Sequence, residues 1–222
     1  MASSFRLYSP TGRRIISIVI IAVVLILVIV RISRHRETDL ANSGRFRVVK
    51  IIDGDTFMIA SGDKVRLANI DTPEFGEPGF EEATVGLERL IAGKEVRVEF
   101  KDRTRDKYGR LVGYVYVDDT VFVGCRMIHQ GLGYVYLLSR DEFERPEVGR
   151  LIAAQREALD KKLGLWAFEH EPEPYYVSTN GIRLHRPGCS YIRNIPADKL
   201  IRYDTREEAF RQGLSPCRGC RP

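Results

Sequence analysis

The sequence has few cysteines, and their positions argue against a disulfide framework. Four of the 222 residues are cysteine, and three of these lie beyond residue 188. A chain stapled by disulfides would spread paired cysteines along its length. The sequence also lacks internal repeats and low-complexity tracts. Hydrophobic residues make up 44% of the chain and charged residues 29%, which is an ordinary globular composition. Together with the length, it predicts one or two folded domains.

No charge of one sign dominates the sequence. The chain has 35 lysines and arginines against 30 aspartates and glutamates, which leaves a net charge of +5 and a pI of about 9.1. A basic surplus suits a polyanionic partner, such as nucleic acid or an anionic membrane surface. Because the acidic residues are interspersed with the basic ones, a mixed soluble surface explains the charge equally well.

One long apolar run lies near the N-terminus. Residues 15–30 are apolar except for Ser17, and arginines stand at both ends. At about 1.5 Å per residue the run makes a helix of roughly 24 Å. The hydrocarbon core of a bilayer is about 30 Å thick, and flanking arginine side chains can snorkel to make up the difference. The run is therefore just long enough to cross a membrane.

Three interpretations of this run compete. A buried core helix is disfavoured, because every face is apolar and arginines flank both ends. A cleaved signal peptide needs small residues soon after the run. That place holds residues 31–36, which are rich in arginine, and the nearest small-x-small site begins at Ala41. We therefore predict that residues 1–36 are a basic head and an uncleaved transmembrane signal anchor, which makes a single-pass membrane protein.

The orientation of the anchor is less clear from the sequence. Basic residues balance on its two sides, so the positive-inside rule gives a tie. A short basic head before a single apolar run is how signal anchors are built. This feature favours a cytoplasmic N-terminus, with the rest of the chain outside the cytoplasm.

Beyond the anchor, a polar linker over residues 37–44 leads into a region rich in predicted strands, residues 45–168. Strands are predicted over 45–52, 56–60, 64–70, 95–100 and 111–117, and helices over 79–92, 123–130 and 145–162. Five strands interrupted by helices predict an α+β fold, a small five-stranded β-barrel of the oligonucleotide-binding type. A Pro/Glu break over residues 169–175 separates this region from a second module, residues 176–222.

Four short elements of the strand-rich region carry charged side chains near predicted strand ends and turns. They are Asp53–Thr56 (DGDT), Arg66, Asp71–Glu74 (DTPE) and Asp106–Arg110 (DKYGR). Each alone has a structural explanation, as a hairpin turn, a helix cap or a charged turn. Together they supply hard carboxylate oxygens for calcium and a further carboxylate to orient water. They also supply two guanidiniums to grip a phosphate. The set predicts a site that cleaves phosphodiesters.

From about Arg45 to Trp166 the chain resembles the staphylococcal nuclease, or thermonuclease, family. The shared motifs are IDGDT, R-x4-DTPE, DKYGR, HQGLGYVY and LGLW, in that order. The resemblance implies the family's barrel fold, hydrolysis of phosphodiester bonds in nucleic acid and dependence on calcium. A nuclease-like barrel that binds nucleic acid without cutting it is the alternative. Such a module should have lost part of the site, whereas this chain retains Asp55, Arg66, Asp71, Glu74 and Arg110.

The resemblance also implies roles for single residues. Asp55, Asp71 and the backbone carbonyl of Thr72 would be calcium ligands. Glu74 would position the attacking water and act as its base. The remaining roles are phosphate binding by Arg66 and Arg110, support of the metal loop by Asp53, and substrate contacts by Lys107, Tyr108 and one of Tyr134 or Tyr136. The products would carry 3′-phosphate ends. The choice between DNA and RNA stays open, and no protein partner follows from the sequence.

The second module carries two closely spaced pairs of metal-ligand residues. His185-x3-Cys189 is followed by Cys217-x2-Cys220. One imidazole and three thiolates make a closed tetrahedral zinc site. A disulfide pair or scattered free thiols are the alternatives, but one disulfide leaves a cysteine over. A module this small also needs a staple such as a metal ion to fold. We therefore predict structural zinc here.

The module resembles the metal-binding domain of the Ada-type DNA alkylation-repair protein. The resemblance runs from Tyr176 through the ligand pairs to Cys220. In that family four cysteines bind zinc, and the first accepts a methyl group. His185 stands at that position here, which makes methyl transfer doubtful and leaves a structural or nucleic-acid-docking role. Four arginines near the ligands either contact phosphates or form a solvated rim: Arg183, Arg186, Arg218 and Arg221. Cys125, outside this module, is interpreted as a small buried hydrophobe.

Overall fold

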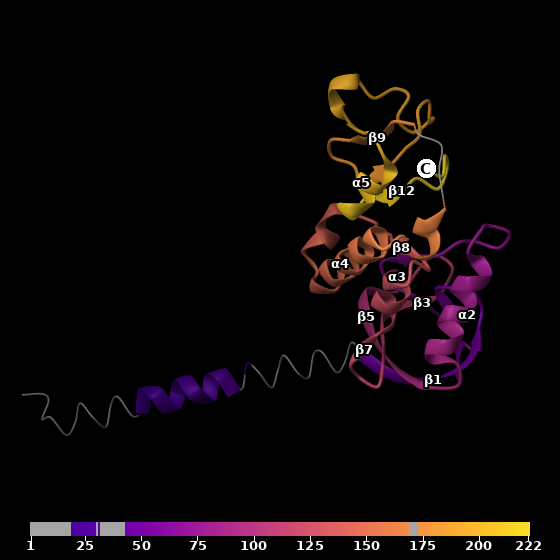
Figure 1. The fold of residues 1–222 in the computed structure, drawn as a ribbon. Helices are drawn as coiled ribbons and strands as arrows, with labels where there is room; N and C mark the ends of the chain where they lie inside the picture. Colours follow the sequence, from indigo (N-terminus) through magenta and orange to yellow (C-terminus); the bar gives the residue numbers. More distant parts are fainter. Residues whose placement is uncertain (1–18, 30, 32–42, 169–172) are drawn as a thin grey trace, which may run out of the picture. The chain divides into compact units, whose positions relative to one another are not determined.

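The computed structural model describes residues 19–29, 31, 43–168 and 173–222, without the side chains of residues 101–104. The chain divides into two units, residues 1–43 and 44–222, which are treated separately. In the first unit, residues 19–29 form a helix (Figure 1) whose apolar side chains are exposed. Among the described residues, no helix combines the length and hydropathy that a membrane crossing requires. Residues 15–18 and 30 of the predicted span, and linker residues 37–42, lie outside the described residues. The transmembrane prediction is therefore not confirmed.

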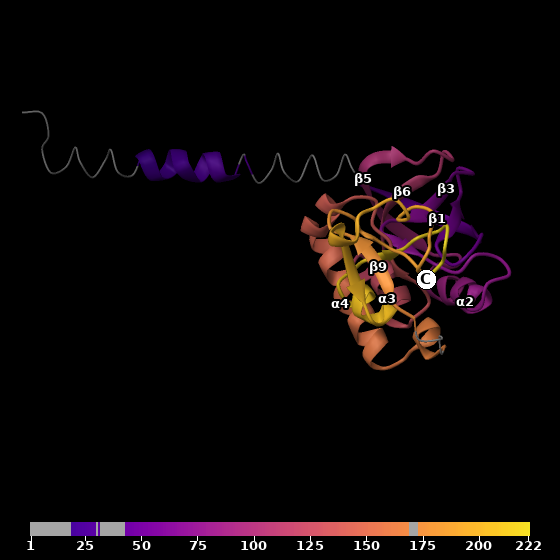
Figure 2. The same cartoon turned by 90° about the horizontal axis from the view of Figure 1, so that it is seen from above.

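The second unit is built on a β-barrel. Its main sheet, in the described part of the chain, has six strands in the order β3-β2-β1-β5-β6-β7. The strands are β1 (Ser43–Ile51), β2 (Thr56–Ile59), β3 (Lys64–Leu67), β5 (Glu95–Arg105), β6 (Leu111–Val117) and β7 (Val121–Phe122). The sheet closes because β3 also pairs with β6, in parallel, with Val65 opposite Leu111. Figures 1 and 2 show these strands gathered together. The predicted five-stranded barrel is confirmed, with β7 as a short extension.

The predicted third strand, residues 64–70, breaks in two. β3 ends at Leu67, and β4 (Ile70–Asp71) pairs instead with β8 (Tyr134–Val135). Asn69 makes the break, because its φ of 58° is a left-handed conformation that ends an extended strand. Its buried side chain accepts a hydrogen bond from the Tyr114 hydroxyl at 2.7 Å. This turn places Asp71 opposite Tyr134 and so positions the site described below.

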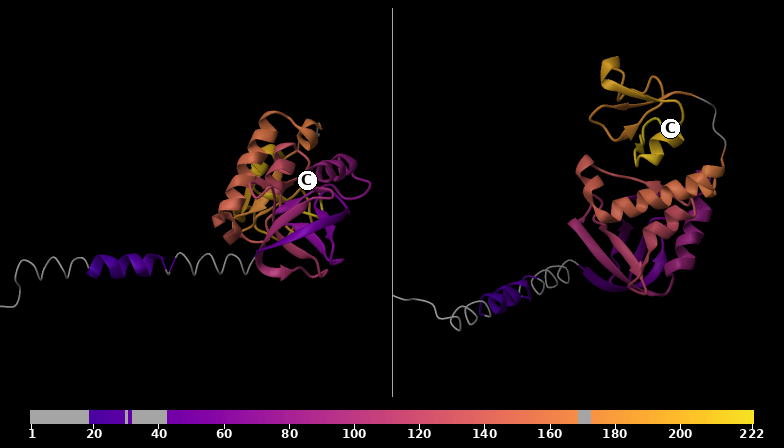
Figure 3. Two further views of the ribbon diagram at one scale, coloured as in Figure 1. Left: turned by 90° about the horizontal axis from the view of Figure 1, so that it is seen from below. Right: turned by 60° about the vertical axis from the view of Figure 1, so that its left-hand side comes forward.

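Three helices cover the barrel, near the predicted ranges. They are α2 (Phe80–Ile91), α3 (Val123–His129) and α4 (Pro146–Asp160), with short 3₁₀ helices η1 (Arg140–Glu144) and η2 (Gly164–Ala167). α2 buries Ala83, Leu87 and Ile91, which recur every four residues and form one apolar stripe. α4 begins with proline at its first turn, where the missing N–H has no helical partner to lose. In Figure 3, α4 lies between the barrel and the C-terminal segment.

The C-terminal segment packs on the barrel rather than standing apart within residues 44–222. Its elements are β9 (Tyr175–Ser178), β10 (Arg183–Leu184), η3 (Ala197–Lys199), β11 (Leu200–Tyr203), α5 (Arg206–Arg211) and β12 (Ser215–Pro216). Leu184, Phe210 and Leu214 belong to the same buried core as the barrel side chains. Buried Gln155 of α4 accepts a hydrogen bond from the Val135 N–H and donates one to the Phe210 carbonyl. Barrel and C-terminal segment therefore share one core.

Candidate active site

Two buried carboxylates form the centre of the candidate site. Asp55 lies in the turn before β2 and Asp71 in β4, and each residue is 4% exposed. Arg66 of β3 joins them, because Nη1 pairs with Asp55 Oδ1 and Nη2 with Asp71 Oδ1. Burial raises the pKa of Asp55, and the guanidinium of Arg66 opposes that rise. Since a buried carboxylate needs a nearby positive charge, this pair is suited to holding a cation.

The loops that carry these carboxylates are held together by short contacts. Asp55 accepts hydrogen bonds from Thr56 Oγ1 at 2.9 Å and from the Thr72 N–H at 3.3 Å. Its own N–H donates to Asp53 Oδ1 at 3.0 Å. The role of Asp53 in supporting a metal loop stays a prediction. At Gly133 a Cβ atom would lie only 2.7 Å from the Asp71 carbonyl oxygen. Only glycine permits β8 to approach β4 this closely.

Arg110 lies directly before β6, beside the same centre. Its Nε donates to Asp106 Oδ2 at 2.8 Å, and Nη1 lies 3.4 Å from Thr56 Oγ1. Thr56 in turn contacts Asp55, so a chain of polar contacts links Arg110 to the carboxylates. The neighbouring Tyr108 is 68% exposed, and the Lys107 ammonium lies 4.9 Å from its ring centre. Both side chains are therefore open to a ligand.

Glu74 is exposed in the loop after β4. Its backbone N–H donates to Glu77 Oε2 at 2.9 Å. Within the described residues, no hydrogen bond or ion pair links the Glu74 carboxylate to the other predicted site residues. The structure thus gathers Asp53, Asp55, Arg66, Asp71, Thr72 and Arg110, and leaves the Glu74 carboxylate facing solvent. Its role in positioning water stays a prediction.

The two candidate stacking tyrosines have different surroundings. The Tyr134 hydroxyl donates to Asp71 Oδ2 at 3.3 Å, and burial raises the pKa of this tyrosine. Tyr136 lies under two guanidiniums, with Arg183 Cζ 4.1 Å and Arg218 Cζ 4.6 Å from its ring centre. Arg218 also donates from Nη2 to Asp71 Oδ1 at 2.8 Å. The sequence did not predict that contact, because nothing in the spacing relates Arg218 to a residue so distant in the chain.

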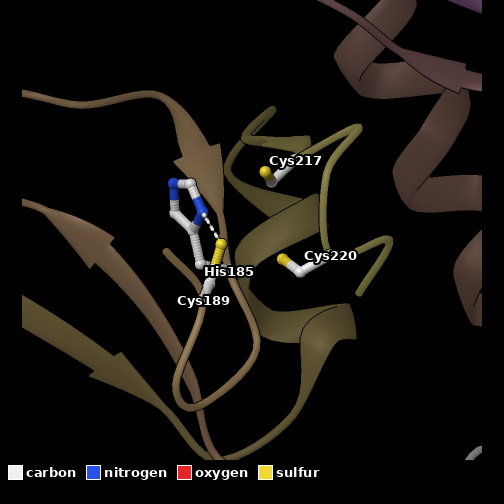
Figure 4. Close-up of side chains that lie close together, drawn as sticks. All are labelled: His185, Cys189, Cys217 and Cys220. Atoms are coloured by element: carbon white, nitrogen blue, oxygen red, sulfur yellow. Dashed lines mark hydrogen bonds between the residues drawn. The ribbon is translucent and has the colours of Figure 1, made fainter. Parts of the chain in front are cut away.

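The predicted zinc ligands converge in the C-terminal segment. Ligand atoms of His185, Cys189, Cys217 and Cys220 all lie within 4.8 Å of one another. In Figure 4 the first pair projects from one side of the cluster and the second pair from the other. His185 Nδ1 and Cys189 Sγ are 3.3 Å apart. All four cysteines of the chain are free, and three of the thiols share this cluster. The fourth, Cys125, is partly buried, and burial raises its pKa to about 11.

Comparison with known proteins shows which family the chain belongs to. Residues 64–168 match the protein family described as staphylococcal nuclease homologue. An uncharacterized endonuclease of Escherichia coli O157:H7 is 35% identical over 134 residues, which are 59% of this chain and 82% of that protein. The chain belongs to the staphylococcal nuclease family. It is a nuclease, and thus a hydrolase, as the sequence predicted.

The chain is also similar to two other nucleases. Micrococcal nuclease of Shigella flexneri is 30% identical over 142 residues, covering 59% of this chain and 78% of that protein. A thermonuclease of Staphylococcus hyicus is 29% identical over 139 residues, covering 57% and 78%. The family match ends at residue 168. The resemblance of residues 176–222 to the Ada-type domain therefore stays a prediction.

Proposed function

We propose that this nuclease hydrolyses phosphodiester bonds of nucleic acid with the help of a calcium ion held by Asp55, Asp71 and the Thr72 carbonyl. The observation that carries the proposal is the pair of buried carboxylates bridged by one guanidinium. These are hard oxygen donors, which calcium prefers. A cationic group already lies between them, so the site fits a cation. When bound, calcium would offset negative charge that develops on the phosphate.

The side chains around the carboxylates would bind and activate the substrate. Arg66 and Arg110 would bind phosphate oxygens, because a planar guanidinium can donate two parallel hydrogen bonds to them. In this structure both guanidiniums pair with carboxylates, which a phosphate would have to replace. Glu74, open to solvent, would hold a water molecule and accept its proton as the water attacks phosphorus. Water would enter opposite the 5′ oxygen, so that the bond between phosphorus and this oxygen breaks, the 5′ oxygen takes up a proton and leaves as a hydroxyl, and the phosphate stays on the 3′ end. Lys107 and Tyr108 would contact a neighbouring nucleotide, as would Tyr134 or Tyr136.

We also propose that His185, Cys189, Cys217 and Cys220 bind one zinc ion. A closed set of one nitrogen and three sulfurs is a structural site, with no position left for water. His185 and Cys189 flank the turn after β10, and Cys217 and Cys220 flank the turn after β12. Zinc would fasten these two turns to each other.

Cleavage in calcium tests the proposed function. The full-length chain should degrade denatured DNA or RNA in millimolar calcium and stop when a calcium chelator is added. End-group analysis should find 3′-phosphates. Binding without cleavage would support the alternative, a nucleic-acid-binding barrel, and full activity in chelator would exclude calcium. The Asp55→Asn variant in calcium should be as inactive as the wild type in chelator, because the substitution removes one of the two carboxylates.

The cellular location is a separate proposal, since the structure does not test it. We propose that residues 15–30 anchor the chain in a membrane, with the nuclease outside the cytoplasm. The apolar composition of this run supports the proposal. Protease added to intact cells should then degrade the nuclease, whereas a cytoplasmic control protein should survive. Protection of both proteins would contradict this orientation.

A further inference from the structure

The turn between two candidate zinc ligands lies against the loop from Asp71 to Glu77, which carries the predicted calcium ligands Asp71 and Thr72. Arg218, between Cys217 and Cys220, donates from Nη2 to Asp71 Oδ1 at 2.8 Å. Arg221, just after this turn, pairs with Glu77 Oε1, and Glu77 also accepts the Glu74 N–H. The C-terminal segment thus contacts both ends of the loop from Asp71 to Glu77. Residues 217–221 are called the arginine turn below.

The arginine turn is built to hold the Arg218 side chain in place. The Gly219 N–H contacts Cys217 Sγ at 3.3 Å, and the Arg221 N–H donates to the Cys217 carbonyl at 2.8 Å. The Arg218 guanidinium lies over the Tyr136 ring, so one face is packed. The Arg218 side chain is nevertheless 55% exposed. It therefore combines a fixed position with access to a ligand.

Asp71 has more positive charge around it than one carboxylate requires. Its Oδ1 receives both Arg66 and Arg218, while Oδ2 accepts the Tyr134 hydroxyl. Two guanidiniums that converge on one oxygen can also converge on a phosphate. Like the Asp71 carboxylate, a phosphodiester offers two charged oxygens that accept hydrogen bonds from guanidiniums. A cation on Asp71 would release both guanidiniums for that purpose.

A pocket continues from Arg218 into the C-terminal segment. It has a volume of about 380 Å³, and its lining includes Arg183, Tyr191, Arg218 and Gly219. Tyr191 is 71% exposed, and a Cβ atom added at Gly219 would lie 2.8 Å from the tyrosine ring. An exposed aromatic ring beside fixed cations is typical of surfaces that bind single strands, where bases stack and phosphates pair with arginine.

We propose that the arginine turn is part of the nuclease's substrate-binding site. Arg218 binds a phosphodiester next to the scissile one, and the pocket at Tyr191 receives the adjoining nucleotide of a single strand. Zinc binding to Cys217 and Cys220 holds Arg218 at this place. This inference rests on the proposed function, because it assigns the strand's path beyond the carboxylate centre.

Binding of an uncleaved strand tests the inference separately from catalysis. The probe is a phosphorothioate-linked oligothymidylate of about twelve nucleotides, within the usual site size of such surfaces. Phosphorothioate keeps the backbone charge and resists hydrolysis. The dissociation constant for the full-length chain is measured in calcium over a series of salt concentrations. Arg218→Ala should weaken binding about tenfold and reduce the salt slope by about 0.7, the value for one phosphate contact on a single strand.

Two further variants separate substrate binding from a structural role. Tyr191→Leu should weaken binding of the same strand about tenfold through lost stacking, with an unchanged salt slope. Arg202→Ala is the matched control, because Arg202 is an exposed arginine of the same segment that pairs with Asp204. It should leave affinity and slope as in the wild type. Zinc content and melting temperature of each variant report whether the segment has stayed folded.

Each outcome decides the inference. If folded Arg218→Ala binds the strand with wild-type affinity and slope, Arg218 only ties the C-terminal segment to Asp71, and the inference is wrong. If that variant fails to fold, wild-type binding by Tyr191→Leu overturns it instead, and weakened binding supports it. Cleavage of ordinary DNA is scored independently. If the wild-type protein does not cleave DNA but its salt slope still depends on Arg218, the proposed function is wrong. The binding surface is supported in that case.

Discussion

Arg218 and Asp71 are 147 residues apart in the sequence, and Arg218 Nη2 lies 2.8 Å from Asp71 Oδ1. This contact joins the two chemically distinctive parts of the chain. One is the carboxylate centre of the barrel, and the other is the His/Cys cluster of the C-terminal segment. Loss of the metal cluster should therefore also disturb the position of Arg218 beside Asp71.

Glu74→Gln should remove cleavage while preserving binding. The amide has the shape of the carboxylate but cannot accept the proton of the attacking water, so we expect a rate loss of about 10² to 10⁴. Rates on denatured DNA are compared with those of Glu82→Gln, a change at an exposed acidic residue in the first turn of α2. Near-normal turnover by folded Glu74→Gln would show that another group activates water.

Arg110→Lys should lose most activity although the charge is kept. A lysine ammonium cannot reproduce the two parallel N–H donors of a guanidinium. It would also lose one of the two Arg110 contacts to Asp106, made through Nε and Nη2 at 2.8 Å each. Arg97→Lys, at an arginine that pairs with Glu99 and Asp119 on the barrel, is the control and should retain activity. Equal rates for the two variants would mean that Arg110 is not the phosphate clamp.

Gly133→Ala should damage the site through its backbone. The added methyl group would lie 2.7 Å from the Asp71 carbonyl oxygen, so β8 and β4 must move apart. A misplacement of this kind can lower the rate about 10²-fold. Overpacking should lower stability by about 1–3 kcal/mol. At Gly149 in α4 a Cβ atom meets nothing within 4 Å. Gly149→Ala should therefore raise the free energy of unfolding by about 0.5–1 kcal/mol. Denaturant titrations and rates of both variants check this contrast.

Metal removal should expose three thiols and not four. At pH 8 the Cys125 thiolate is scarce, because burial raises the pKa of Cys125 to about 11. Burial also raises the pKa of Cys220 in the folded segment, to about 12, but loss of the metal should open the two turns and expose Cys189, Cys217 and Cys220. A disulfide reagent added with a strong zinc chelator should then react quickly with these three thiols, and one equivalent of zinc should be released. Cys125→Ser should give the same fast count. The metal site would be contradicted if three thiols reacted quickly without any chelator. It would also be contradicted if the purified protein contained no zinc.

Phe210→Ala should destabilise the barrel as well as the C-terminal segment. Phe210 is 2% exposed, and its ring centre lies 5.1 Å from that of Trp166. Loss of such a buried ring costs about 3–5 kcal/mol. Because the core is shared, residues 44–222 should still unfold in one transition at a lower temperature. Phe168→Ala, at a residue that is 50% exposed, is the control. Separate melting of the C-terminal segment would show that the two parts are independent.

The sequence alone determined the barrel, the residues of the candidate site and the two closely spaced His/Cys pairs of the C-terminal segment. Strands β1, β2 and β6 and the three barrel helices lie near their predicted ranges, because alternation and helical periodicity are local properties of the chain. Asp55, Arg66 and Asp71 were also recognisable, because short motifs that resemble those of the nuclease family occur together and in the same order. His185, Cys189, Cys217 and Cys220 were found by spacing alone.

Tertiary structure decided what lies between those motifs. The left-handed turn at Asn69 ends β3 early and pairs Asp71 with Tyr134. No local pattern signals it, because an asparagine in an apolar run adopts that conformation only when the fold supplies buried partners. The contact of Arg218 with Asp71 likewise depends on how α5 packs against α4, which the long-range core determines. Sequence spacing carries no record of such contacts, because they arise only after the segments have packed.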